Sequence, residues 1–325
     1  MSWTMAEFSK IETDVLRKSV IDGFLMNIPI METIPWETIG QLSTGIIRVK
    51  DLPSVGFRKI NDGYAESTGH FEQKMEQIAL LGGDIDTDKA YARAKNTVAD
   101  ARAIQQNLML KAMSFAFNDK FINGDPKSDA LEFQGLKERV DDLYAEGYTG
   151  QKLDAACSGV GILNSSTTSH AFLDKLDALM YSISGRKPDF LLMNGKTLLA
   201  LRSLLRREKL LDTTKDMFDR IIDIYQGARL VDIGTKADMS TEIILNTETT
   251  AGETGGSECS SIYAVKFGVG DMLWGIQEYP LEVEDLGQLE SKPVYRTRVD
   301  WPLGLANIDT KAVSRLYGIT ADASS

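Results

Sequence analysis

The fold is decided by residues 88–122, DKAYARAKNTVADARAIQQNLMLKAMSFAFNDKFI, which contain neither glycine nor proline. An uninterrupted stretch of this kind predicts one helix about 52 Å long, whereas a typical helix has about 11–12 residues. We expect Asp86 and Asp88 to cap the N-terminus of this helix. Gly124 and Pro126 are expected to end it.

One face of the long helix is predicted to be buried. Its apolar residues follow alternating steps of three and four, and they are Tyr91, Ala94, Val98, Ala101, Leu108, Ala112 and Phe115. Because the stripe is single and rich in alanine, a helix lying across a sheet fits it better than a coiled coil. We therefore expect Leu108→Ala to cost about 2–5 kcal/mol of stability.

Two segments before the helix lack an apolar core of their own. Residues 44–83 predict a long polar β-hairpin, because Asn61-Asp62-Gly63 and Ser67-Thr68-Gly69 are turn signals. Residues 27–39, NIPIMETIPWETI, are apolar but contain two prolines that prevent a continuing helix. This arm packs either on its own domain or on another subunit.

The rest of the chain predicts a second α+β unit. A Ser/Thr cluster at 165–169 begins one helix, and residues 136–146 and 196–209 predict two more. The predicted strands are 189–193, 228–233, 242–246, 261–267, 272–277, 281–283 and 294–301. Residues 247–260 are expected to form an exposed, mobile loop, and residues 310–316 a short helix.

Composition excludes several classes of protein. The chain has 325 residues, which suggests about two domains. Its 36 basic and 47 acidic residues give a net charge of −11, which disfavours general nucleic-acid binding. Two cysteines, Cys157 and Cys259, and two histidines, His70 and His170, disfavour a disulfide framework, zinc chemistry and histidine catalysis. No apolar stretch is long enough to span a membrane and no signal peptide is present, so we expect a soluble, cytoplasmically made protein with free thiols.

Short motifs give no catalytic, cofactor or metal site. Asp84-x-Asp86-x-Asp88 matches the start of a calcium loop, but Lys89 and Lys95 stand where glycine and glutamate are required, so a helix cap is favoured. Gly195-Lys196-Thr197 lacks the upstream glycine of a phosphate-binding loop, which favours a strand–helix turn.

Two further clusters also favour structural interpretations. Ser169-His170 has no nucleophile elbow around it. The basic series Arg202, Arg206, Arg207 and Lys209 is interpreted as a solvated helix face, with packaged nucleic acid or an acidic neighbour as the alternative. Since no chemistry is indicated and several segments need outside support, the residues predict a self-assembling structural protein.

The order of these elements resembles that of HK97-like major capsid proteins of tailed bacteriophages. The resemblance rests on FINGD at 121–125, FQGL at 133–136, PDFLLMN at 188–194, IYAVKFG at 262–268, VEDLG at 283–287 and YRTRVDW at 295–301. It implies an α+β fold with an N-terminal arm (1–43), an extended β-hairpin or E-loop (44–85), a peripheral domain with a spine helix (86–155 and 282–325) and an axial domain (156–281).

The resemblance also implies a function. Hexamers and pentamers of the chain would form an icosahedral shell that encloses double-stranded DNA without sequence-specific binding. The protein would be assembled in the host cytoplasm and found in the virion. Expected partners are further copies of the chain, a portal protein and, as an optional addition, a decoration protein. Because the arm begins almost at Met1, a separate scaffolding protein is also expected.

Within this picture the hairpin would lie on a neighbouring subunit. The candidate inter-subunit residues are Arg48, Lys50, Arg58, Lys59, Glu66 and Glu72. No lysine–asparagine crosslink is expected. Two alternatives remain, namely an encapsulin-type shell that packages an enzyme and a soluble α+β enzyme.

Overall fold

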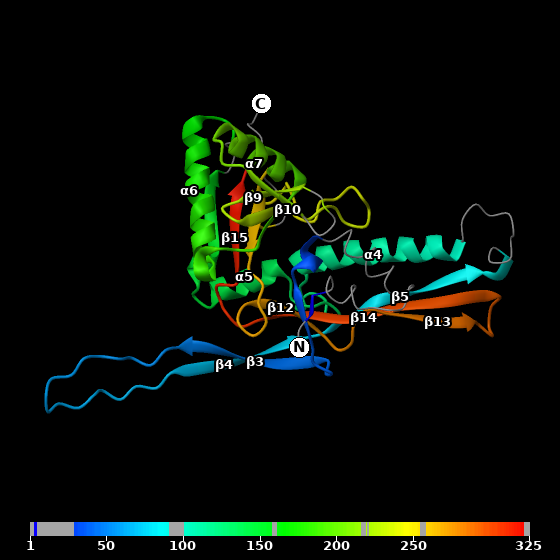
Figure 1. Cartoon of the computed structure of the whole chain (residues 1–325), viewed down its shortest axis with the longest axis horizontal. Helices are drawn as coiled ribbons and strands as arrows, with labels where there is room; N and C mark the ends of the chain where they lie inside the picture. The colour runs from blue at the N-terminus through cyan, green and yellow to red at the C-terminus, as the bar shows by residue number, and fades with distance from the viewer. Residues whose placement is uncertain are drawn as a thin grey trace.

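A computed structural model describes residues 3–4, 29–90, 101–157, 161–215, 219, 221–253 and 258–321. Figure 1 shows an elongated molecule with three parts. A two-sheet body lies in the middle, the hairpin of β3 (Ser43–Asp51) and β4 (His70–Gln77) projects from one end, and helix α4 (Ala101–Asn123) extends toward the other. The predicted α+β class and the hairpin are confirmed.

Within the described residues, the first sheet has six strands, which are built around the long strand β14. Its order is β1-β2-β12-β14-β13, and β5 pairs separately with β14 in an antiparallel ladder that runs from Ala79–Leu303 to Asp88–Val294. The helix α4 packs along β5 (Figure 1), as expected for a helix lying across a sheet. The strands are β1 (Trp3–Thr4), β2 (Pro35–Thr38), β5 (Ala79–Asp88), β12 (Leu273–Gln277), β13 (Glu282–Gln288) and β14 (Val294–Asn307).

The part of the second sheet that the structure describes has seven strands, in the order β6-β15-β11-β7-β10-β9-β8. Helices α6 and α7 cover it with an apolar layer that includes Phe172, Leu176, Leu201 and Leu205. The strands are β6 (Lys152–Cys157), β7 (Phe190–Met193), β8 (Asp212–Lys215), β9 (Ile221–Tyr225), β10 (Ala228–Asp232), β11 (Ser260–Val265) and β15 (Val313–Ile319). The helices of the body are α5 (Leu136–Ala145), α6 (Ser166–Ser182), α7 (Gly195–Arg207) and the short turns Pro29–Glu32, Thr149–Gln151 and Ser184–Arg186.

An aromatic cluster joins the arm, α4 and the first sheet. The ring of Phe117 lies 6.5 Å from that of Trp36, 5.7 Å from Phe121, 6.2 Å from Phe133 and 6.1 Å from Trp301, and all five residues are buried. Because Trp36 belongs to β2, the described part of the arm packs on its own chain. This settles the choice between the two alternatives for residues 29–39.

The buried face of α4 differs from the predicted one. Leu108 is 56% exposed and Ala112 is exposed, while Leu110, Met113, Phe117 and Phe121 face the core. Leu108 was therefore assigned to the wrong face. Both stripes have helical spacing, and the one with the larger apolar side chains is buried because it removes more apolar area from water. Tyr91, Ala94 and Val98, and the side chain of Ala101, lie outside the described residues.

The start of the helix also differs. Asp86 lies in β5, so its assignment as a helix cap is wrong, whereas the Asp88 carboxylate accepts a 2.7 Å hydrogen bond from the Ala90 amide. The ionic partners of Asp84 and Asp86 are Arg298 and Arg296 of β14, which pair with β5 along the sheet.

Three other predictions are wrong. Residues 310–316 are not a helix, because β15 inserts between β11 and β6 and is buried along nearly its whole length. Residues 242–246 form no strand beyond an isolated bridge between Thr235 and Glu242. The loop after Asn246 is anchored rather than mobile over its described part, because Glu248 and Gly252 are buried.

Candidate assembly surfaces

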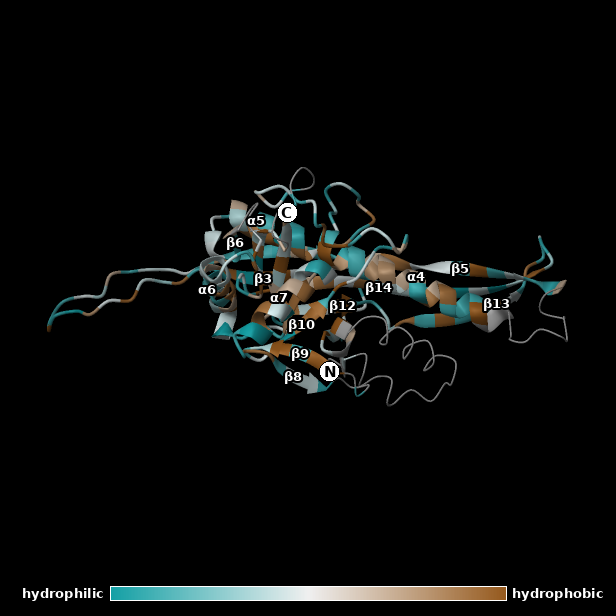
Figure 2. Cartoon of the chain, turned by 90° about the horizontal axis from the view of Figure 1, so that it is seen from above, coloured by the Kyte–Doolittle hydropathy of each residue, from teal (hydrophilic) through white to brown (hydrophobic). Residues whose placement is uncertain are grey.

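Among the residues that the structure describes, the hairpin touches the body only at its base. Strands β3 and β4 pair antiparallel from Ser43–Gln77 to Asp51–His70, and residues 52–69 between them form no further strand. All residues from 49 to 73 are exposed. Figures 1 and 2 show that the tip projects well beyond the body. The tip exposes large apolar side chains, namely Leu52, Val55, Phe57 and Ile60.

The two faces of the β3–β4 ribbon have opposite character. On the outer face, Val49 pairs with Phe71, and Ile47 and Met75 continue the same row. All four side chains are more than half exposed. We call these four residues the outer face. A row of this size without a partner is typical of an interaction surface.

The inner face of the ribbon packs on the body. Ile46 packs with Trp274, Ile276 and Ala306, and the Arg48 guanidinium lies 2.6 Å from the Glu146 carboxylate. Next to it, Glu76 makes a two-pronged ion pair with Arg139 of α5, with N–O distances of 2.7 and 2.9 Å.

A third cation lies among these pairs. Burial is the main reason why the pKa of Lys74 is lowered, and the Arg139 charge lowers it further. The inner face is thus a dense charge cluster made within one chain.

The candidate inter-subunit residues fall into two groups. Arg48 is buried and pairs with Glu146 of its own chain, with Glu72 3.8 Å away, so the structure gives it an intramolecular role. The residues Lys50, Arg58, Lys59 and Glu66 are exposed on or near the tip. Arg58 donates a 3.1 Å hydrogen bond to the Asp62 carbonyl and its guanidinium lies 5.1 Å from the Tyr64 ring.

Sequence reasoning missed Arg139, Glu76 and Glu146. Their partners are 63 and 98 residues away along the chain, and no local spacing signals such a pair. Predicting these ion pairs requires knowing which strand lies next to α5.

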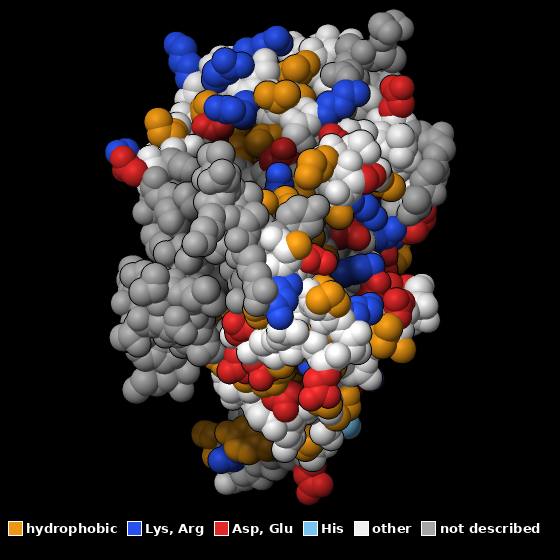
Figure 3. All heavy atoms as spheres, turned by 90° about the vertical axis from the view of Figure 1, so that its right-hand side faces the viewer, with side chains coloured by type: hydrophobic (Ala, Val, Ile, Leu, Met, Phe, Trp, Pro, Cys, Tyr) orange, Lys and Arg blue, Asp and Glu red, His pale blue; other side chains and the backbone are white. Residues whose placement is uncertain are grey.

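A second exposed apolar surface, with no partner among the described residues, lies on α4. Ile104 and Leu108 are 47% and 56% exposed and are one helical turn apart. We call these two residues the α4 stripe. It lies on the half of the molecule opposite the hairpin (Figure 1). Figure 3, which looks at that end, shows acidic and basic side chains interspersed with hydrophobic ones.

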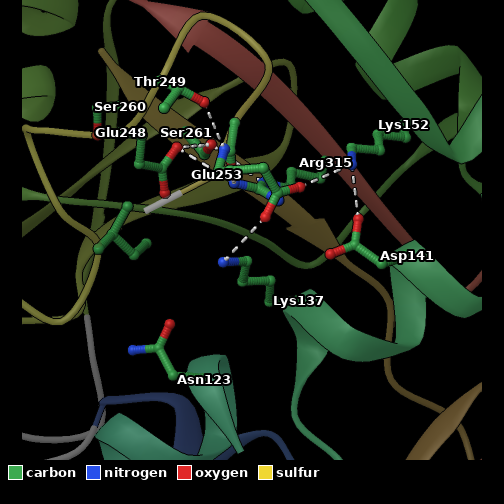
Figure 4. Close-up of polar contacts among 12 residues, drawn as sticks. Asn123, Lys137, Asp141, Lys152, Glu248, Thr249, Glu253, Ser260, Ser261 and Arg315 are labelled. Atoms are coloured by element: carbon green, nitrogen blue, oxygen red, sulfur yellow. Dashed lines mark hydrogen bonds and ion pairs between the residues drawn. The ribbon is translucent and has the colours of Figure 1, made fainter. Parts of the chain in front are cut away.

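Polar contacts also join the second sheet to α5 (Figure 4). Arg315 is fully buried and donates hydrogen bonds to the Glu248 carboxylate at 3.2 Å and to the Gly252 carbonyl. Glu253 lies 3.6 Å from Lys152 and 3.9 Å from Lys137. Burial raises the pKa of Glu248. These groups are engaged with one another, which is typical of a structural network.

The sequence motifs have structural roles in the described chain. Asn194 caps α7 by accepting a 2.8 Å hydrogen bond from the Thr197 amide, and the buried Ser169 hydroxyl donates to the Ile162 carbonyl. His170 is exposed on α6 beside Glu208, 3.5 Å away. In the basic series, Arg202 pairs with Asp223.

Neither a metal site nor a membrane helix is found in the described residues. No group of three or more potential metal-ligating side chains occurs there. Nor is any helix among them long and apolar enough to cross a membrane.

Comparison with known proteins bears on what these surfaces do. A family model described as major capsid protein GP7 matches residues 14–171, which include the hairpin and α4. No curated protein matches the sequence. Among solved structures, the SrpI encapsulin complex of Synechococcus elongatus PCC 7942 has a TM-score of 0.63 at 14% identity, covering 91% of this chain and 89% of that one.

Two further solved structures give similar values. The capsid of a native GTA particle has a TM-score of 0.58 at 14% identity, covering 91% of this chain and 90% of that one. A structure from Mycobacterium phage Bobi has a TM-score of 0.57 at 11% identity, with the same coverage. At these identities the likeness shows a shared fold. The chain therefore has the HK97-like fold, and its resemblance to major capsid proteins is confirmed.

Proposed function

We propose that the chain is the major capsid protein of a tailed bacteriophage. Hexamers and pentamers of it would tile an icosahedral shell around double-stranded DNA, and the protein would be assembled in the host cytoplasm and carried in the virion. The observation that carries this proposal is the hairpin, whose tip and outer face expose large apolar side chains that no part of the described chain covers. An exposed apolar surface of this kind is typical of a site that binds another protein.

The arrangement of the two apolar surfaces supports assembly in rings. The outer face and the α4 stripe lie toward opposite ends of the molecule (Figure 1). A contact between two different surfaces of identical subunits is head-to-tail, and it closes into rings when the rotation between subunits allows. We propose that the hairpin of one subunit covers the α4 stripe of the next. The exposed Arg58 and Lys59 would meet acidic side chains at the margin of this contact.

The domain assignment is part of the proposal. The N-terminal arm is 1–43 and the E-loop 44–85, while the axial domain is 156–281 and the peripheral domain comprises 86–155 and 282–325. Sheet membership favours two adjustments. Strand β12 pairs with β14 in the first sheet, so residues 273–277 go with the peripheral domain. Strand β15 pairs with β11, so residues 313–319 go with the axial domain.

The remaining partners are proposed on the same basis. We propose that portal and scaffolding proteins act with the chain during assembly, that a decoration protein can be added, and that DNA is held without sequence-specific contacts. The net charge of −11 agrees with weak general contact to DNA. No enzymatic activity is proposed, because the charged groups of the network in Figure 4 pair with one another.

An encapsulin-type shell is the second candidate, and the likeness to the SrpI encapsulin complex favours it. The two candidates differ in what the shell contains. Particles purified from cells that produce the chain with its neighbouring genes would hold nuclease-protected DNA under the first proposal and a packaged protein under the second.

Electron microscopy and proteolysis test the shell itself. Purified protein should form rings or closed particles, alone or with a scaffold. Trypsin should cleave quickly after Arg58 or Lys59 in free subunits and slowly in particles, since exposed tips are preferred cleavage sites. Phe57→Ser should impair assembly, whereas Leu131→Ser, on an exposed loop of the body, serves as the matched control. Equal cleavage rates in free and assembled protein would contradict the role of the hairpin.

A further inference from the structure

We propose that two ion pairs at the base of the hairpin form a clamp, which sets the direction of the hairpin before any neighbouring subunit is bound. The clamp consists of Arg139–Glu76 and Arg48–Glu146. The inference rests on the proposed function only where it concerns assembly. The geometry of the unassembled subunit can be tested separately.

The hairpin needs such a device because a two-stranded ribbon is not rigid by itself. An isolated ribbon of two strands is marginal in water. Here the apolar contact at its base is small, since Ile46 is the only residue of β3 or β4 in the cluster with Trp274, Ile276 and Ala306. An apolar contact of this kind is non-directional and permits tilting. Charged contacts with fixed geometry are needed to define an angle.

The Arg139 side chain supplies fixed geometry. Both of its terminal nitrogens bind Glu76, one of them also donates to the Leu305 carbonyl at 2.8 Å, and the remaining nitrogen donates to the Gln134 carbonyl at 3.1 Å. The guanidinium of this α5 residue therefore binds β4, β14 and the segment just before α5. The side chains of Arg139 and Glu76 are only 1% and 4% exposed, so water does not loosen the pair. A planar fork of donors facing a carboxylate restricts orientation as well as distance.

The second ion pair, Arg48–Glu146, gives the hairpin a second point of attachment to the body. Arg48 is on β3 and binds Glu146, the residue that ends α5, while Arg139 lies near the start of the same helix. The two helix positions are seven residues apart, which corresponds to about 10 Å. On the ribbon, Arg48 is opposite Glu72, four residues from Glu76, which corresponds to about 13 Å. Two contacts with matching spacing align the ribbon along α5, whereas a single contact would allow it to pivot.

The clamp also explains the polarity of the ribbon. It holds the charged face on the body and leaves Ile47, Val49, Phe71 and Met75 facing outward. Buried ion pairs add little net stability compared with apolar contacts. Their effect here is orientation, which lowers the ordering cost when a neighbour is bound.

The test measures direction in the unassembled subunit. Fluorophores placed at Lys59 and Lys209 by unnatural amino acids report the distance between the hairpin tip and the body, since both residues are exposed. The wild type should give one narrow distance distribution by single-molecule energy transfer. Glu76→Gln combined with Glu146→Gln should broaden it. Asp84→Asn is the matched control, because it removes a carboxylate from an exposed two-pronged pair with Arg298 that does not touch the hairpin.

Assembly supplies the second readout. The protein concentration at which shells form should rise about tenfold or more in the double variant and stay unchanged in the control. If the double variant keeps the wild-type distance distribution, the clamp does not set direction and the proposal is wrong. Should Glu76→Gln prevent folding, Glu146→Gln alone carries the test, because that side chain is 37% exposed and its loss is tolerable. An unchanged distribution in that variant overturns the proposal as well. If the wild type forms no shell, the proposed function is wrong. The distance distribution in the unassembled subunit still tests the clamp in that case.

Discussion

Two alanine substitutions on α4 distinguish contacts that stabilise the subunit from contacts that stabilise the shell. Phe117→Ala removes a ring that is 0% exposed and lies against both Trp36 and Trp301. Because four aromatic neighbours surround the site, the chain cannot easily collapse into the space. We expect the free energy of unfolding to fall by about 3–5 kcal/mol.

Leu108→Ala is the matched variant, nine residues earlier on α4. Leu108 is 56% exposed, so little apolar area is lost and no enclosed cavity forms. Surface substitutions of this kind change stability by about 0.5 kcal/mol or less. The effect of Leu108→Ala on assembly is expected to be larger than its effect on stability. If the hairpin of a neighbour covers the α4 stripe, Leu108→Ala should raise the concentration needed for assembly.

Urea unfolding of unassembled subunits measures the first effect. Tryptophan fluorescence reports it directly, because Trp36 and Trp301 line the site, and an unchanged slope with denaturant shows that the compared states are the same. Light scattering measures assembly on the same samples. Equal losses of stability in the two variants would refute the assignment of helix faces. A wild-type assembly threshold for Leu108→Ala would refute the proposed contact on the α4 stripe.

Three further predictions concern titratable and thiol groups. Lys74→Met should stabilise the subunit at neutral pH, because burial and then Arg139 lower the Lys74 pKa. A lysine of this kind costs stability while it is charged, so the gain measured by urea unfolding should vanish as the pH rises through the folded pKa toward about 10.4. A hydrogen bond from Arg298 lowers the pKa of Asp84, so the stabilisation it gives is present above about pH 3.9 and is lost as the pH falls through the folded pKa. Arg298→Gln should therefore raise the Asp84 pKa in a carbon NMR titration, and an unchanged pKa would contradict the pairing. Cys259 is buried and free, so it should react with a thiol reagent only on unfolding, and rapid labelling of the native protein would contradict this.

Local signals predicted the elements that depend on local physics. Asn194 and Ser165 cap helices where the sequence placed helix starts, and the buried strand Phe190–Met193 follows the apolar run directly. Residues 136–145 form a helix that Gly147 ends as expected. In each case the side chain that decides the structure lies within four residues of the backbone group it serves.

The failures occur where partners are distant. Both faces of α4 have apolar residues at helical spacing, and the choice between Leu108 and Phe117 depends on Trp36 and Trp301. The local pattern of residues 310–316 is compatible with a helix. They form β15 because β11 and β6 offer hydrogen-bonding edges on both sides. Among the candidate inter-subunit residues, Arg48 likewise has a distant partner in its own chain, Glu146, which no local spacing indicates.

Because the charged residues at the base of the hairpin pair within one chain, we expect apolar contacts to drive assembly. On the inner face of the ribbon, Arg48 and Glu76 form ion pairs with Glu146 and Arg139 of the same chain. The surfaces that remain available to a neighbouring subunit are the apolar outer face, the tip and the α4 stripe. Raising the salt concentration from about 0.1 M to about 1 M shortens the screening length from about 10 Å to about 3 Å, which weakens exposed ion pairs but not apolar burial. The assembly threshold measured by light scattering should therefore stay constant or fall with added salt. A threshold that rises steeply would mean that exposed charges such as Arg58 and Lys59 carry the contact, and that the apolar faces do not.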